Sequence, residues 1–348
     1  MWSVVPSFEA ILQALSVVFT QPSYQTNWQI FVGWLMCLGR RTEFRVFEAF
    51  RGKHVARKQR HPFDREYNFF SRAAWSVVEL ARHVAVKLVN TLNPDRELLL
   101  IVDATLLHKR GQHVWALGWF YDPAISTKKR SVIAPGNKWV VLGLAVRIPL
   151  TNRYLCLPIH AMLQIQGEDQ PSEADLARRM IEEVAQWFPD RRLLLIGDGA
   201  YSAKNLVRDL NPRVRYVGLM RKDAELYEPL HAVPIGRGRY RQRGPRLPAP
   251  HEIAKLADQA TTPSSRWRWT TIWVWAYGQK RRFQVVAFQA IWRKVFGPRP
   301  IQVVVVRSLD KGYGDVYHFT TDLMASAAWV VETYAKRTWI EAMFKNSK

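Results

Sequence analysis

LLLIVDATLL, residues 98–107, is a short apolar run that contains one acid, Asp103. Nearly the same letters return in LLLIGDGAYS, residues 193–202, where Asp198 takes the matching position, and each buried strand is predicted to end at its acid. Short apolar runs bounded by turns and charges are typical of buried β-strands. If the two strands are adjacent and parallel, both carboxylates emerge at the same edge of a sheet, where α/β proteins place their sites.

Strand-like and helical segments alternate around these two runs. A helix is predicted over residues 172–188, where Ser172 and Asp175 suit a capping box and the apolar residues recur along one face. Further strands are predicted over residues 139–149, 154–163 and 215–221. Alternation of this kind is typical of an α/β core with a site at its strand ends.

The composition indicates a polyanionic partner. Lys and Arg number 51 against 29 Asp and Glu, which gives a formal net charge of +22. Because neutralising phosphates releases counterions, such a chain favours nucleic acid, with an anionic membrane surface as the second candidate. Cys37 and Cys156 form neither a metal-ligand spacing nor a disulfide framework. With no signal-peptide start and no apolar run of membrane-spanning length, the sequence predicts a cytoplasmic protein.

Two regions depart from the α/β alternation. Residues 7–92 carry apolar positions three and four apart and are predicted to be helical. Residues 266–292 alternate strictly and are predicted to form a β-hairpin that turns at Gly278. We therefore expect four parts: a helical N-terminal DNA-binding region, residues 1–95; a first core part, 96–221; a β-rich insertion, 222–299; and a second core part, 300–348.

The paired acids allow two interpretations. An aspartate at a strand end commonly caps a turn or a helix, which needs no metal. Carboxylates that lie close together, however, repel one another unless a cation lies between them. Two Mg²⁺ ions roughly 4 Å apart activate a water and stabilise the leaving oxygen in phosphodiester hydrolysis. A metal site of that kind requires a third acid.

The closing segment YAKRTWIEAMFKNSK, residues 334–348, supplies a candidate third acid. On one helix, Tyr334, Arg337, Glu341 and Lys348 fall within a wedge of roughly 60°. A carboxylate that ligates metal would then lie among groups that grip phosphates. A charged face on which Arg337 and Glu341 simply pair at four-residue spacing is the alternative. The spacing alone leaves both interpretations open.

The spacing Y-x2-R-x3-E-x6-K in this segment resembles the signature of bacterial insertion-sequence transposases of the DDE type, in their YREK branch. The segments around Asp103 and Asp198 resemble the first two motifs of that family. The resemblance implies a ribonuclease-H-like core with a β-rich insertion between the second and third acids. It also implies that Asp103, Asp198 and Glu341 are catalytic and bind two Mg²⁺ ions, for which Mn²⁺ substitutes.

The same resemblance implies an activity and its partners. Such an enzyme nicks DNA at transposon ends, forms and reopens a hairpin, and transfers the end into target DNA. Its partners would be double-stranded DNA, as terminal inverted repeats and target, and a second copy in a homodimeric synaptic complex associated with the bacterial nucleoid. Family members ordinarily continue past the position of Lys348. The alternative expectation is therefore a truncated, non-catalytic DNA-binding product that occupies transposon ends and inhibits transposition.

A set of cationic and aromatic residues is expected to bind DNA. It comprises Tyr334, Arg337, Lys348, Arg237, Arg239, Arg241, Arg243, Trp267 and Trp269. The alternate arginines would track phosphates or enter a minor groove, or else form a solvated loop. A flipped base needs an aromatic platform, for which Trp273 and Trp275 are further candidates. Alternating tryptophans on a strand are equally an ordinary buried face.

Overall fold

The computed structural model describes residues 6–39, 41–52, 64–93, 95–127, 129–229, 244–309 and 314–347. It separates into two compact units, Met1–Pro94 and Asp95–Lys348. Arg237, Arg239, Arg241, Arg243 and Lys348 lie outside the described residues. None of the helices in the described part is both long and apolar enough to cross a membrane.

The first unit is helical, as its sequence period predicts. Its elements are α1 (Pro6–Ala14), a 3₁₀ turn (Ser16–Val18), α2 (Gln21–Met36), α3 (Glu43–Arg51), α5 (Asp64–Ser71) and α6 (Val77–Leu92). The pattern of residues 65–89 does not form one helix, because α5 ends at Ser71 and α6 begins after Ser76. Between them Trp75 turns back to stack on Phe69 at 5.3 Å and to donate its indole N–H to the Phe69 carbonyl. Aromatic packing therefore divides the helical segment.

The second unit contains, within the described residues, one ten-stranded mixed sheet. Its strands are β1 (Glu97–His108), β2 (Gly118–Tyr121), β3 (Ile133–Arg147), β4 (Tyr154–Gln164), β5 (Arg192–Ile196), β6 (Val214–Leu219), β7 (Thr270–Ala276), β8 (Gln279–Ile291), β9 (Pro300–Ser308) and β10 (Val316–Thr320). Its helices are α7 (Glu173–Trp187), α8 (Lys204–Val207), α9 (Pro250–Asp258), α10 (Arg293–Phe296), α11 (Ala327–Ala335) and α12 (Thr338–Ser347). The predicted capping box of α7 is present, with Ser172 and Asp175 bonded reciprocally.

The strand order confirms the predicted fold class, a ribonuclease-H-like α/β core. Strands β4, β3 and β1 are antiparallel neighbours, and β5 and β6 continue the sheet parallel to β1. The register aligns Leu98 with Leu193 and Ile101 with Ile196, so the two matched runs of the sequence are side by side. Asp103 and Asp198 each follow the aligned isoleucine by two residues. The parallel pairing that the sequence analysis required is confirmed.

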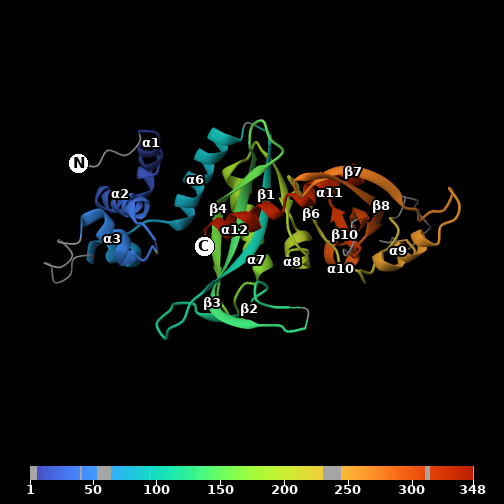
Figure 1. The fold of residues 1–348 in the computed structure, drawn as a ribbon, viewed down its shortest axis with the longest axis horizontal. Coiled ribbons are helices and arrows are strands. Elements are labelled where there is room, and N and C mark those ends of the chain that lie inside the picture. The colour runs from blue at the N-terminus through green and yellow to red at the C-terminus, as the bar shows by residue number, and fades with distance from the viewer. Residues whose placement is uncertain are drawn as a thin grey trace, which may run out of the picture. The chain divides into compact units, whose positions relative to one another are not determined.

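The hairpin predicted at Gly278 forms and prolongs the core sheet. Strands β7 and β8 join the core through β9 and β10, in the order β6-β10-β9-β8-β7. Helix α11 packs on one face of this extension, where Val274 and Val330 share a buried cluster. Helix α9 covers part of the opposite face, where Ile253 packs with Val286. Figure 1 shows β7 and β8 as long curved strands beside α11. The segment 270–291 is thus continuous with the core through backbone hydrogen bonds.

Helix α12 lies across the strands that carry the first acid. Figure 1 shows it crossing β1 and β4, and these contacts hold it to the sheet. Its anchor is Ile340, which is fully buried with Ile101 of β1, Ile196 of β5 and Cys156 of β4. Since Glu341 is the next residue, the packing of Ile340 fixes where the third candidate acid lies.

We predict that Ile340→Ala lowers the free energy of unfolding by about 2–5 kcal/mol, because it removes a fully buried side chain and leaves a cavity. Chemical denaturation followed by circular dichroism measures the change. The matched control is Met324→Ala, at a residue that is 91% exposed, for which we expect a change within about 0.5 kcal/mol. Equal effects of the two substitutions would show that α12 is not anchored by Ile340.

Candidate active site

The two aspartates present equivalent oxygens at the same edge of the β1–β5 pair. Asp103 Oδ1 accepts the backbone N–H of Ala104 at 2.9 Å, and Asp198 Oδ1 accepts that of Ala200 at 2.8 Å. Asp103 lies inside β1, which runs on to His108, whereas Asp198 lies in the turn after β5. The first run therefore does not end at its acid as predicted, because β3 stays paired with β1 beyond this point. In both acids Oδ2 is the oxygen that remains for another partner.

The turn that carries Asp198 is braced by residues that were not singled out in the sequence. Ser202 Oγ donates to the Asp198 carbonyl at 3.2 Å and lies 3.3 Å from the hydroxyl of buried Tyr216. Tyr201 is also buried, and its hydroxyl donates to Glu173 at 3.4 Å. Burial raises the pKa of Tyr201 well above its ordinary value, so the phenol stays neutral as a donor. The signal was an aromatic residue inside GAYS, a segment otherwise typical of a turn.

All three candidate acids converge on one cation, Arg337. Its Nη2 donates to Asp103 Oδ2 at 2.8 Å and lies 3.6 Å from Asp198 Oδ2. Its Nη1 donates to Glu341 Oε1 at 2.6 Å. The Arg337 side chain is only 18% exposed, and its Nε is buried without a hydrogen-bond partner in the described structure. The Arg337–Glu341 pair of the alternative interpretation forms, and the same guanidinium also reaches the two aspartates, so Glu341 as a metal ligand stays a prediction.

The closing segment is two helices rather than the single helix of the wedge argument. Tyr334 lies on α11, Arg337 in the turn that follows, and Glu341 on α12. Around the turn the backbone N–H of Arg337 bonds to the Tyr334 carbonyl, and that of Ile340 bonds to the Arg337 carbonyl. These three-residue bonds are of the tighter 3₁₀ type, and Thr338 Oγ1 also donates to the Ala335 carbonyl. The tightening changes the direction of Arg337 relative to a regular helix.

Tyr334 lies beside this cluster without bonding to the acids. Its ring contacts His318 at a centroid distance of 4.5 Å, and it packs against the buried clusters on both sides of α11. Burial raises the pKa of Tyr334 above its ordinary value, so the phenol is neutral at physiological pH. It is available as a hydrogen-bond donor at the rim of the acidic site.

The donor set fits a hard divalent cation in its chemistry, although the acids are not yet at ligating distance from one point. Mg²⁺ prefers one or two carboxylates together with waters and substrate phosphates. The Oδ2 atoms of Asp103 and Asp198 both face Arg337, which shows that one cation position serves both. In the described part of the chain, no three His, Cys, Asp or Glu residues are close enough together to hold a metal ion as they stand. Glu341 is the most exposed of the three acids, at 54%.

The predicted tryptophans differ in burial along one face of the hairpin. Trp267 packs edge-on against Phe288 at 5.0 Å, and Trp269 donates its indole N–H to Asp258 at 2.9 Å with Arg307 over its ring. Both belong to the cluster under α9. Trp273 and Trp275, further along, are 59% and 48% exposed. The face is therefore core where α9 covers it and open beyond.

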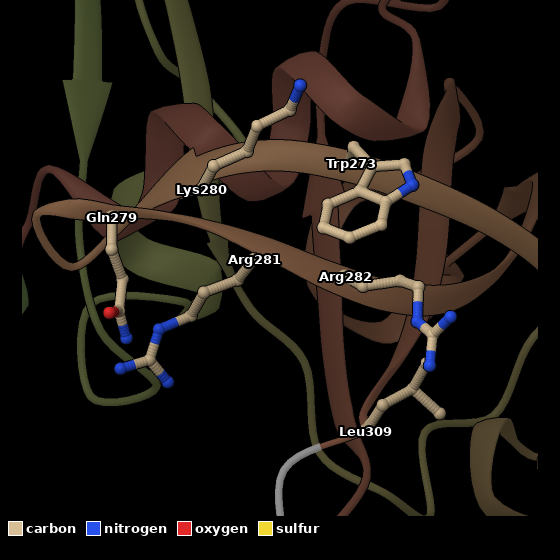
Figure 2. Close-up of a pocket in the computed structure, with 6 residues that line it drawn as sticks. All are labelled: Trp273, Gln279, Lys280, Arg281, Arg282 and Leu309. Atoms are coloured by element: carbon tan, nitrogen blue, oxygen red, sulfur yellow. The ribbon is translucent and has the colours of Figure 1, made fainter.

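Two cations missed in the sequence complete the open part of that face. Lys280 and Arg282 lie opposite Trp275 and Trp273 across the strand pair. The Lys280 Nζ lies 5.8 Å and the Arg282 Cζ 5.9 Å from the Trp273 ring centroid. Figure 2 shows Trp273 with these two cations about it. We call Trp273, Trp275, Lys280 and Arg282 the hairpin face. The signal was QKRR directly after the turn, at cross-strand spacing from the tryptophans.

Comparison with known proteins assigns the family. The family model described as "DDE superfamily endonuclease" matches residues 19–282. The chain belongs to the DDE superfamily endonucleases. No curated protein matches. Among solved structures, the piggyBac transposase in its synaptic complex with hairpin DNA is similar over 98% of this chain, at 11% identity and a TM-score of 0.38, and the match spans 57% of the piggyBac chain.

The match to the DDE superfamily confirms the predicted DDE class. It contains Asp103 and Asp198, whereas Glu341 lies beyond its last residue. Glu341 is therefore a candidate third acid on geometry alone, since Arg337 joins it to the same cluster as Asp103.

The pKa of Asp103 in this candidate site is determined mainly by burial. Desolvation raises the pKa of Asp103 to about 6, the Arg337 guanidinium lowers it, and the charges of Asp198 and Glu341 raise it. The ordinary value for Asp is about 3.9. The folded state therefore binds a proton in a range of pH where the unfolded chain has already lost it. Asp103 thus contributes stability that is present at low pH and is lost as pH rises from about 4 to about 6.

We predict that Asp103→Asn changes the pH dependence of unfolding. The amide stays neutral at every pH, so the variant does not lose this stability as pH rises. The difference in free energy of unfolding, variant minus wild type, should therefore increase by up to about 3 kcal/mol between pH 4 and pH 7. Urea unfolding in the presence of a chelator, at intervals of one pH unit, measures this difference. A difference that stays constant with pH would contradict the raised pKa.

Proposed function

We propose that this DDE-family chain is a metal-dependent transposase, a nuclease and strand transferase that cuts DNA at transposon ends and joins them to target DNA. The observation that carries the proposal is the convergence of three carboxylates from separate elements on one cation position. Two of these acids lie in the region that the family shares. Aspartates that only cap separate turns would not be expected to share one cation.

Asp103, Asp198 and Glu341 are proposed to hold two Mg²⁺ ions, with Mn²⁺ as a substitute. When bound, such ions lower the pKa of a water and stabilise the leaving oxygen of a phosphodiester. The protein's part is to aim the ligands. Backbone amides fix Oδ1 of both aspartates, which leaves the two Oδ2 atoms on the same side. The orientation of each aspartate is thus fixed in advance, and the acids would still have to move closer together when a cation binds.

The neighbours of the acids suit the positioning of DNA. Arg337 has a planar guanidinium that matches phosphate geometry, and Tyr334 adds a neutral donor beside it. Both are proposed to contact phosphates that flank the scissile one. Lys348 and the arginines at 237, 239, 241 and 243 stay proposed DNA contacts on sequence grounds.

The hairpin face is a second proposed contact with DNA. The segment 259–309 contains no Asp or Glu, so no acid on these strands opposes a phosphate. Exposed Trp273 and Trp275 offer flat surfaces for a base, and Lys280 and Arg282 offer charge beside them. Aromatic platforms flanked by cations are how proteins hold unpaired bases. Trp267 and Trp269, half-covered by α9, are the weaker candidates for this role.

The finer parts of the proposal follow the sequence resemblance. They are origin in a bacterial insertion sequence of the YREK branch, a hairpin intermediate at each end, and a homodimeric synaptic complex on terminal inverted repeats. The second candidate function is a DNA-binding product that occupies transposon ends without cleaving them. The two functions differ in whether DNA is cut.

We predict that Asp198→Asn reduces metal-dependent nicking of a supercoiled plasmid carrying the element's ends by about 10²-fold or more, because the amide is a poor metal ligand. Gel analysis in Mg²⁺, Mn²⁺ and EDTA measures the rate. Asp190→Asn, at an exposed position after α7, is the matched control and should keep the wild-type rate. Nicking that persists in Asp198→Asn would remove this acid from the site. Binding without nicking by the wild type would establish the inhibitor instead.

We predict that changing Lys280 and Arg282 together to Gln lowers the slope of log Kd against log salt by about 2, because two phosphate contacts are lost. Fluorescence anisotropy with labelled end DNA at several salt concentrations measures the slope. The control is Arg178→Gln on α7, which removes an exposed arginine away from the hairpin. An unchanged slope in the double variant would exclude the hairpin face as a phosphate contact.

A further inference from the structure

The Arg337 guanidinium takes the oxygens that a metal would need. In Asp103 and Asp198 a backbone N–H bonds to Oδ1, which leaves Oδ2 as the oxygen that faces the shared cation position. Arg337 Nη2 faces both of these Oδ2 atoms, at 2.8 and 3.6 Å. Its Nη1 holds Glu341. One monovalent cation thus stands in the shared position of all three acids.

Arg337 and a divalent ion cannot keep that position together. Like charges a few ångströms apart repel strongly where the surroundings are partly desolvated. The acids, in turn, repel one another when no cation is present. Without metal, Arg337 is therefore the group that offsets this repulsion. With metal, the same guanidinium becomes an uncompensated like charge.

The contacts of Arg337 allow its guanidinium to move away from the acids. Its Nε is buried without a partner in the described residues, so the side chain is held by its two Nη groups alone. The residue lies in the tightened turn between α11 and α12, where its backbone is hydrogen-bonded independently of the side chain. Rotation about the side-chain bonds would move the guanidinium without breaking either helix.

We propose that Arg337 is an internal counter-ion that holds the three acids together in the metal-free chain, is displaced when a divalent ion binds, and is thereby released to a DNA phosphate. This inference rests on the metal-dependent function proposed above. It makes metal and DNA binding mutually favourable, because each removes a competitor of the other. Cutting is then confined to the state in which both are bound.

The first test measures Mn²⁺ binding to the full chain without DNA, by isothermal titration calorimetry. Arg337→Gln removes the competing charge and should bind Mn²⁺ at least about 5-fold more tightly than the wild type. Arg337→Lys keeps the charge and should stay close to the wild type. The matched control is Lys336→Gln, one residue away, where the ammonium lies over the Tyr154 ring. It should leave the affinity within about 2-fold.

The outcomes separate this inference from the function on which it rests. Asp198→Asn serves as the reference that removes a metal ligand. If Asp198→Asn abolishes Mn²⁺ binding but Arg337→Gln binds no more tightly than the wild type, the metal site stands and the counter-ion is overturned. If Asp198→Asn binds like the wild type, or if neither the wild type nor Arg337→Gln binds Mn²⁺, the proposed metal function fails and the inference fails with it.

A second measurement uses the unaltered chain and so does not depend on a variant that folds. Phenylglyoxal modifies accessible arginines, and mass spectrometry reports the rate at each site. Mg²⁺ should accelerate the modification of Arg337 several-fold, because displacement exposes the guanidinium. Arg215, paired with Glu97 and Asp322, is the internal control and should not respond. A rate at Arg337 that Mg²⁺ leaves unchanged or lowers would overturn the proposal.

Discussion

The parallel pairing of β1 with β5 is the constraint on which the site depends. It fixes Asp103 and Asp198 in equivalent positions on adjacent strands, and backbone amides then fix one oxygen of each. Two carboxylates so placed are costly when buried, as the raised pKa of Asp103 shows. A nearby cation offsets the repulsion between these two carboxylates. The packing of α12 through Ile340 brings Glu341 and Arg337 to it, and Arg337 supplies the charge.

Much of the fold could be predicted because its signals are local. The repeated LLLI-x-D runs indicated the paired strands, Ser172 and Asp175 gave the start of α7, and Gly278 gave the hairpin turn with a φ of 80°. Each of these signals lies within one element or one turn. No such local signal indicated which strands pair beyond β1 and β5. The continuation of the sheet from β6 through β10 to β7 depends on pairing between distant segments.

The sequence named the candidate acids and Arg337, but not the arrangement in which the structure brings them together. Helical periodicity brought Arg337 and Glu341 to one face, yet it could not show that Arg337 reaches Asp103, which lies 234 residues earlier. The two ends of the tryptophan face share one sequence pattern, and the cover of α9 makes Trp269 partly buried where Trp273 is open. Tertiary packing decides these features, and periodicity within one element carries no information about it.

The continuous sheet fixes the separation between its strands, including those that lead to Asp198 and carry the hairpin face. Five strand-to-strand steps separate β5, which leads to Asp198, from β7, which carries the hairpin face. At about 4.8 Å a step, the separation measured across the strands is about 24 Å. That length corresponds to about seven base pairs of B-form DNA. Hydrogen-bonded strands do not stretch, so this separation across the sheet stays constant when a partner binds at either end of it.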